Sequence, residues 1–145
     1  MDDDGPSPRI LVANRQTEPV DDEGLIELAR VTLVGEARAA SELSIAFVTP
    51  EEMAELHERF MDEPGPTDVL SFPLDERGDD GMAVLGDVVI APAVAASNNP
   101  EDPAAEMRLL LVHGILHLLG HDHEDEGDRR EMWKIQERYS GVDVS

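Results

Sequence analysis

Three histidines close together form the part of the sequence best suited to chemistry. They are His113, His117 and His123, in the stretch His113-Gly-Ile-Leu-His117-Leu-Leu-Gly120-His-Asp-His123. Residues four apart lie on one face of an α-helix, so His113 and His117 can turn their imidazoles toward a common centre. Gly120 can adopt the left-handed conformation that ends a helix, which lets the chain bring His123 back to that centre. The spacing predicts a metal site with three histidine ligands.

Two observations favour a catalytic zinc ion over a pair of core histidines. The segment Met107–Leu119 is apolar except for Arg108 and two histidines, and an unpaired imidazole buried there costs on the order of a few kcal/mol, which a shared cation removes. The chain has no cysteine, so any ligand is histidine or carboxylate. Three histidines match catalytic zinc sites, whose open position holds a water with its pKa lowered towards about 7. We expect one zinc ion per chain and a hydrolytic reaction.

The elements that position these histidines form a predicted α+β fold with a small mixed sheet of about four strands. Apolar runs indicate strands at Ile10–Ala13, Leu43–Val48, Asp68–Phe72 and Leu85–Ile90. We expect Pro73 to end the third strand, and residues 75–81 to form the turn that pairs the last two strands as a hairpin. The two Pro/Gly-rich stretches, 62–66 and 98–103, are predicted loops.

Helical periodicity and N-terminal caps place helices at 21–33, 49–60, 107–119 and 124–139. We expect them to pack mainly on one face of the sheet. The segment 107–119 is apolar all round, which predicts a buried central helix that carries the metal ligands. The last helix has Met132, Trp133 and Ile135 as its predicted core anchors. A single domain is expected over residues 1–145, with 1–7 as a disordered tail.

The charge balance limits the classes of partner. The formal net charge is −22, from 11 basic and 33 acidic residues, which disfavours broad electrostatic binding of nucleic acid. A polyanionic partner would therefore have to bind to a local basic patch or to the metal ion. The acidic N-terminus does not look like a signal peptide, and the longest apolar run, Leu109–Gly120, is too short to span a bilayer. We expect a cytoplasmic protein without membrane contact.

The histidine spacing equals that of the metzincin peptidases, whose pattern His-Glu-x-x-His-x-x-Gly-x-x-His has a glycine where Gly120 stands. The general base of those enzymes is the glutamate directly after the first histidine. This chain has Gly114 at that position. The sequence therefore keeps the ligand geometry and lacks the peptidase base, which disfavours peptide hydrolysis.

Three motifs together resemble the YbeY family of bacterial endoribonucleases. They are the histidine stretch 113–123, Pro66-Thr-Asp-Val-Leu-Ser-Phe-Pro73 and Leu85-Gly-Asp-Val-Val-Ile90. The resemblance covers nearly the whole chain and implies that His113, His117 and His123 bind zinc. It further implies a metal-dependent, single-strand-specific RNase that acts in 16S ribosomal RNA 3′-end maturation and ribosome quality control. Implied partners are a single-stranded ribosomal precursor RNA and the ribosome or its small-subunit proteins.

One position departs from this resemblance. Many members carry an arginine shortly before the Pro-Thr-Asp motif, where this chain has Met61. Arg59 lies two residues earlier, which on a helix is close to the opposite face, so we expect it to be a solvated surface residue. We likewise expect His57 to have a surface role and His121 to face outward from a loop.

Other residues keep two interpretations open. The strand Asp68–Phe72 is either an ordinary sheet strand or runs beside the metal, where Ser71 and Thr67 could bind phosphate. Asp122 could orient a ligand imidazole or cap a turn, and Asp87 could face the cleft or cap a turn. No residue stands out as a general base, so no catalytic side chain is assigned.

The sequence is also compatible with two alternative functions. One is a non-catalytic ribosome-assembly factor with a structural zinc, which the acidic charge favours. The other is a different zinc hydrolase, such as a peptidase or amidase, against which Gly114 argues. The sequence favours the endoribonuclease.

Overall fold

One four-stranded mixed sheet underlies the fold. The computed structural model describes residues 7–78, 80–121 and 126–142, so the predicted tail lies, except for its last residue, outside the described residues. In the described part the strands are β1 (Arg9–Asn14), β2 (Ser41–Phe47), β3 (Val69–Arg77) and β4 (Ala83–Ile90). Their order is β1-β2-β4-β3; β2 runs parallel to β1 and β4, and β3 pairs antiparallel with β4. This confirms the predicted mixed sheet, the α+β class and the predicted hairpin, which β3 and β4 form.

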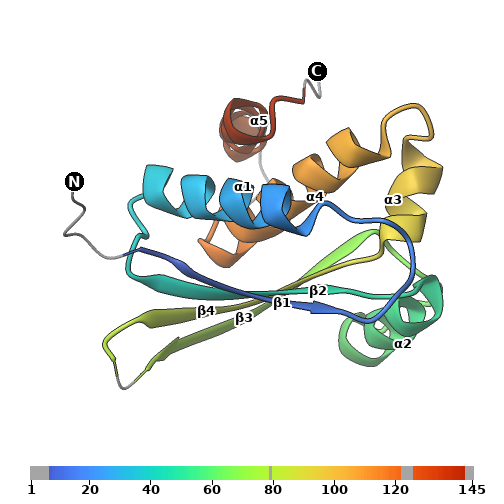
Figure 1. Cartoon of the computed structure of the whole chain (residues 1–145), viewed down its shortest axis with the longest axis horizontal. Helices are drawn as coiled ribbons and strands as arrows, with labels where there is room; N and C mark the ends of the chain where they lie inside the picture. Colours follow the sequence, from blue (N-terminus) through green and yellow to red (C-terminus); the bar gives the residue numbers. More distant parts are fainter. Residues whose placement is uncertain (1–6, 79, 122–125, 143–145) are drawn as a thin grey trace.

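The helices lie mainly on one face of this sheet, as predicted. Four of them, α1 (Asp22–Gly35), α3 (Pro92–Asn98), α4 (Pro103–Leu118) and α5 (Glu126–Ser140), lie above it in Figure 1. The helix α2 (Pro50–Met61) covers one end of the opposite face. Among the described residues no helix has both the length and the apolar character needed to cross a bilayer.

Capping side chains fix where the longer helices begin. Asp21 accepts a hydrogen bond from the Gly24 amide at α1, and Thr49 accepts one from the Glu52 amide at α2. Asp102 does the same for the Ala105 amide, so α4 begins four residues before the predicted start at Met107. Asp102 and Pro103 form the same signal as Thr49 and Pro50, a cap followed by proline. The sequence prediction missed this signal and the short helix α3.

The predicted end of the third strand at Pro73 is wrong, because β3 continues to Arg77. Proline lacks an amide hydrogen, but an edge strand such as β3 tolerates it where no ladder bond is required. The pairing with β4 changes register between Pro73 and Glu76. Opposite Pro73 stands Gly86, with φ of 133°, where a Cβ would come within 2.1 Å of the Phe72 carbonyl oxygen. Only glycine lets the two strands approach this closely.

The helix α4 packs at the centre of the molecule, which confirms the predicted buried helix. Its residues Leu111 and Ile115 are fully buried in the main core, against the sheet and α1. Gly114 faces the sheet so closely that a Cβ there would lie 2.7 Å from Cγ1 of Val88. A side chain at 114 would therefore have to displace Val88, so this packing disfavours a peptidase-type glutamate at this position.

The variant Gly114→Glu tests this packing. We expect it to lower the free energy of unfolding by at least about 3 kcal/mol, because it overpacks the α4–sheet interface and buries a carboxylate. Urea denaturation measures the loss. The control Val31→Glu, at an exposed position of α1, should change stability by less than about 0.5 kcal/mol. Equal stability of the two variants would contradict the packing described here.

Candidate metal centre

His113 and His117 bring two ring nitrogens together on one face of α4. Their Nε2 atoms are 3.1 Å apart, and the ring centroids are 4.6 Å apart at an interplanar angle of 73°. Both side chains are half-buried. The structure thus places the two imidazoles as the four-residue spacing predicts.

This geometry fits a zinc ion. With Zn–N bonds of 2.0–2.1 Å and tetrahedral angles, two ligand nitrogens lie about 3.3 Å apart. The 3.1 Å between the Nε2 atoms of His113 and His117 is close to that distance. His123, the third predicted ligand, and Asp122 lie outside the described residues, and within the described part no group of three or more possible ligands gathers. The described donor pair fits a zinc site that needs at least one further ligand.

Contacts with the end of α4 and the end of α1 hold the turn that follows α4. Gly120 has φ of 96°, and the His121 amide donates to the Leu116 carbonyl at 3.0 Å. The His121 ring does not face outward as expected: it is half-buried, with Nε2 3.4 Å from a carboxylate oxygen of Glu36. The other oxygen of Glu36 accepts a hydrogen bond from the Tyr139 hydroxyl at 2.9 Å. The end of α1 and the helix α5 therefore hold the segment that leads to His123.

Gln136, on α5, contacts a predicted ligand and was missed from the sequence. Its Oε1 lies 2.5 Å from Nδ1 of His113, and the side chain is only 4% exposed. The predicted anchors Met132 and Ile135 are buried, whereas the third, Trp133, is 42% exposed because it points away from their face of α5. The sequence did contain a signal for Gln136. It lies four residues after Met132 and one after Ile135, on the helix face that packs against the core.

A cavity of about 320 Å³ lies beside the histidine pair. Its lining residues come from the end of α2, the edge strand β3 and α4: Met61, Val69, Leu70, Ser71, Pro73, His113 and His117. Of the two interpretations left open for this strand, the structure shows the one in which it runs beside the histidines. The Ser71 hydroxyl donates to the Gly114 carbonyl at 3.0 Å, which ties β3 to α4. Thr67 and the exposed Asp87 do not line the cavity.

Met61 lines this cavity and Arg59 does not. The Arg59 guanidinium instead lies 6.0 Å from the centroid of the Phe60 ring, on the exposed side of α2. His57, expected to have a surface role, is half-buried: Nδ1 is 2.9 Å from the Gly65 carbonyl oxygen and Nε2 is 3.4 Å from Glu63. Among the described residues, the cavity wall includes no lysine or arginine.

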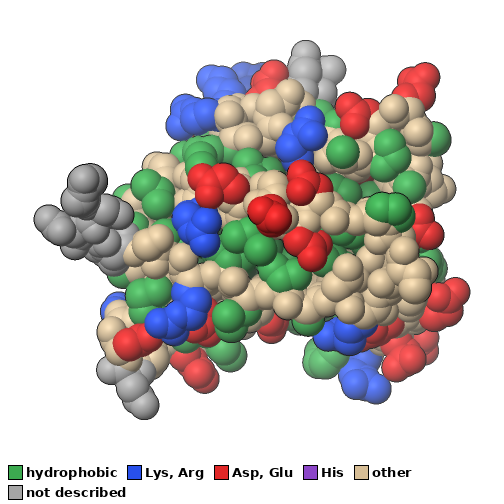
Figure 2. Space-filling view, viewed as in Figure 1, with side chains coloured by type: hydrophobic (Ala, Val, Ile, Leu, Met, Phe, Trp, Pro, Cys, Tyr) green, Lys and Arg blue, Asp and Glu red, His purple; other side chains and the backbone are tan. Residues whose placement is uncertain are grey.

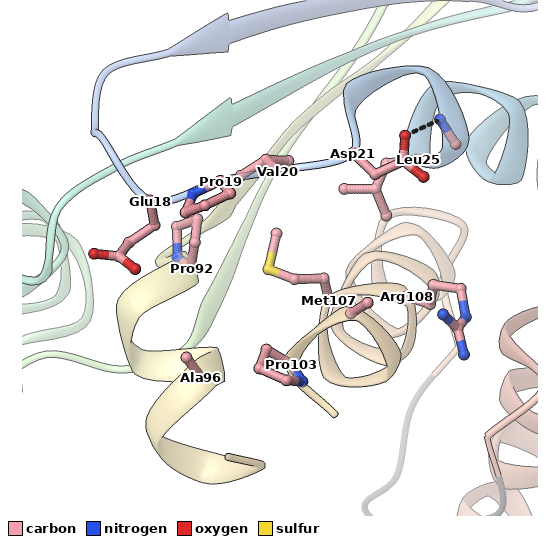
Figure 3. Close-up of a pocket in the computed structure, with 12 residues that line it drawn as sticks. Glu18, Pro19, Val20, Asp21, Leu25, Pro92, Ala96, Pro103, Met107 and Arg108 are labelled. Carbon is pink, nitrogen blue, oxygen red and sulfur yellow. Dashed lines mark hydrogen bonds between the residues drawn. The ribbon is translucent and has the colours of Figure 1, made fainter. Parts of the chain in front are cut away.

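A larger cavity of about 370 Å³ lies elsewhere, between α3 and the N-terminal ends of α1 and α4 (Figure 3). Its wall is mostly apolar and has no histidine among the described residues. Two of its polar side chains are engaged within the protein: Asp21 caps α1, and Arg108 donates to the Ser140 carbonyl at 3.2 Å. The face shown in Figure 2 has acidic side chains over α1 and shows no histidine. The residues suited to chemistry are therefore in the smaller cavity.

The chain is similar to known proteins over most of its length. The family model described as Endoribonuclease YbeY matches residues 11–141. Curated proteins named Endoribonuclease YbeY from Acidothermus cellulolyticus and Thermobifida fusca are 49% and 47% identical; the alignments cover 88% of this chain, and 86% and 88% of those proteins. The class is a hydrolase that cleaves phosphodiester bonds within RNA, as the resemblance implied. The chain belongs to the YbeY family of endoribonucleases.

A solved structure supports the fold. The solution structure of TM1509 from Thermotoga maritima matches with a TM-score of 0.60 and 28% identity, covering 92% of this chain and 86% of that one. The α+β arrangement described here is thus shared with an experimentally determined protein.

The contact between Tyr139 and Glu36 yields a prediction with a pH dependence. Tyr139→Phe should lower the free energy of unfolding by about 1 kcal/mol near neutral pH, because the hydroxyl donates to Glu36. Burial, and then the Glu36 carboxylate, raise the pKa of Tyr139. A raised folded-state pKa means that the stabilisation is complete below the ordinary tyrosine pKa and is lost as the pH rises through the raised value. Urea titrations of both proteins from neutral to alkaline pH should show their difference shrinking; a constant difference would contradict this.

Proposed function

We propose that this protein is a zinc-dependent, single-strand-specific endoribonuclease that acts in the cytoplasm on 16S ribosomal RNA, in 3′-end maturation and ribosome quality control. The observation that carries the proposal is the convergence of the His113 and His117 Nε2 atoms, 3.1 Å apart, in a cavity lined by an edge strand. Membership in an endoribonuclease family supports the RNA substrate.

His113, His117 and His123 would hold one zinc ion. When bound, zinc polarises a phosphoryl oxygen and lowers the pKa of a water molecule, which supplies a nucleophile near neutral pH. The chain's own contribution is to fix the surroundings. The bond from Ser71 to the Gly114 carbonyl sets the distance between β3 and the histidines, so an RNA strand laid along β3 passes the ligands at a constant separation. No carboxylate among the described residues lines the cavity, and no general base is assigned.

The composition of the cavity favours single-stranded RNA. Duplex recognition depends on cations that follow the phosphates of both strands, and the described wall has none. Apart from Ser71, the wall facing the histidines is apolar, formed by Met61, Val69, Leu70 and Pro73. An unpaired nucleotide can pack its base or ribose on such a wall while its phosphate meets the metal. A base inside a duplex cannot turn in this way.

Recruitment by the ribosome accounts for the acidic charge. A chain with a net charge of −22 has little long-range attraction for free RNA. Basic small-subunit proteins could bind this acidic surface and bring the precursor RNA end to the cavity. The same charge supports a second candidate function, a ribosome-assembly factor whose zinc only stabilises the fold.

A ligand variant separates these two functions. We expect the purified protein to contain about one zinc per chain and to cut single-stranded RNA faster than duplex RNA. His113→Ala should lose more than about 100-fold in cleavage rate, because removing a ligand costs more than the 10–100-fold typical of residues that support one. The matched control His57→Ala removes a half-buried histidine outside the cavity and should retain activity. A folded His113→Ala protein that cuts as fast as the unmutated chain would show that the zinc is not catalytic.

Met61→Arg should improve the enzyme at low salt. It places a cation in the cavity wall, where many family members carry an arginine, and one added phosphate contact should make the salt dependence of RNA binding steeper by about one unit of slope. Fluorescence anisotropy with a single-stranded oligonucleotide across a salt series measures the slope, and kcat/KM should rise several-fold. Val34→Arg, at an exposed position of α1, adds the same charge away from the cavity. Equal gains from both variants would mean that only net charge matters.

A further inference from the structure

A buried glutamine on the last helix contacts the metal centre. We propose that Gln136 is a positioning residue that holds His113 in the tautomer protonated on Nδ1 and thereby aims the Nε2 lone pair at the metal centre. The inference rests on the zinc site of the proposed function and adds a residue from α5 to it.

The chemistry follows from the two atoms in contact. The Oε1 atom of Gln136 can only accept a hydrogen bond, so Nδ1 of His113, 2.5 Å away, must carry the proton. A neutral imidazole has one N–H, so Nε2 is left with its lone pair. Nε2 is the atom that lies 3.1 Å from Nε2 of His117. A single hydrogen bond therefore selects which nitrogen can bind a cation.

Packing keeps the amide in this position. Met132 and Ile135 of α5 pack with Val112 and Leu116 of α4 in a buried cluster, next to which Gln136 is 4% exposed. One turn later, the Ser140 hydroxyl donates to the backbone carbonyl of Gln136 at 2.6 Å and so fixes the helix at this residue. The amide side chain cannot turn into solvent, so its oxygen stays on the imidazole. Partners of this kind orient ligand histidines and raise their basicity in many metal proteins.

The surroundings of Gln136 argue against a role in packing alone. The residues that flank it on α5, Met132 and Ile135, belong to an apolar cluster, and leucine has a similar size without the cost of burying an amide. A side chain with an acceptor oxygen is needed at this place because the half-buried Nδ1–H of His113 requires an acceptor. Glutamine therefore suits the hydrogen bond to His113, whereas the apolar cluster alone would favour an apolar side chain.

Variants at position 136 test the proposal with two measurements that do not depend on RNA cleavage. Nitrogen-15 NMR of the metal-free protein at about pH 8, where an ordinary imidazole is neutral, reports the His113 tautomer. Competition with a chromogenic chelator reports zinc affinity. Gln136→Leu should lose the Nδ1-protonated tautomer and weaken zinc binding about 10–100-fold. Gln136→Glu, which keeps an acceptor oxygen, should retain both properties.

The control is Met132→Leu, which changes a buried neighbour on the same face of α5 and keeps the hydrogen bond. It should match the unmutated protein in tautomer and zinc affinity. The proposal is overturned if Gln136→Leu keeps the tautomer and binds zinc within about two-fold of the unmutated protein, or if Met132→Leu loses both properties as Gln136→Leu does. Failure of the proposed function looks different: the unmutated protein then binds no zinc, or binds it without cleaving RNA, while the NMR measurement still reports the tautomer.

Discussion

The close contact of α4 with the sheet across Gly114 is the constraint on which the site depends. With no side chain at 114, the helix lies against Val88 and its backbone carbonyl comes within reach of the Ser71 hydroxyl. His113, directly before Gly114, and His117, three residues after it, then face the cavity beside β3. A wider helix–sheet spacing would leave the histidines in place on α4 but would remove the wall that faces them.

The local parts of this arrangement could be predicted from the sequence. Strand and helix periodicities and the cap residues Asp21 and Thr49 act over a few neighbouring residues, and so does the spacing of His113 and His117. The effect of Pro73 depends on whether its strand lies at an edge. That is decided by the pairing of β4 with β2, which is distant in the sequence. The short α3 lacks a side-chain cap, and a helix of this length has little periodicity to detect.

Residues that act across elements could not be predicted in the same way. Gln136 becomes part of the site only when α5 packs on α4, and Met61 only when the end of α2 reaches the cavity beside β3. Glu36 meets His121 and Tyr139 over long stretches of chain. Such contacts depend on tertiary packing and leave no pattern in neighbouring residues. The motif resemblance identified the family from a different kind of information, namely the order of three short segments.

Pro73 has a consequence for how this protein meets other chains. An edge strand that forms the wall of an open cavity stays uncovered, and an uncovered strand can pair with a strand of another molecule. At Pro73 the backbone has no hydrogen to donate, and the change of register between Pro73 and Glu76 interrupts the regular spacing that an incoming strand would need. A polymer that contacts the side chains of β3 can therefore bind at the cavity wall. A strand that needs a continuous row of backbone hydrogen bonds cannot pair with β3 there. The same proline that shapes the cavity protects the folded protein from edge-to-edge association.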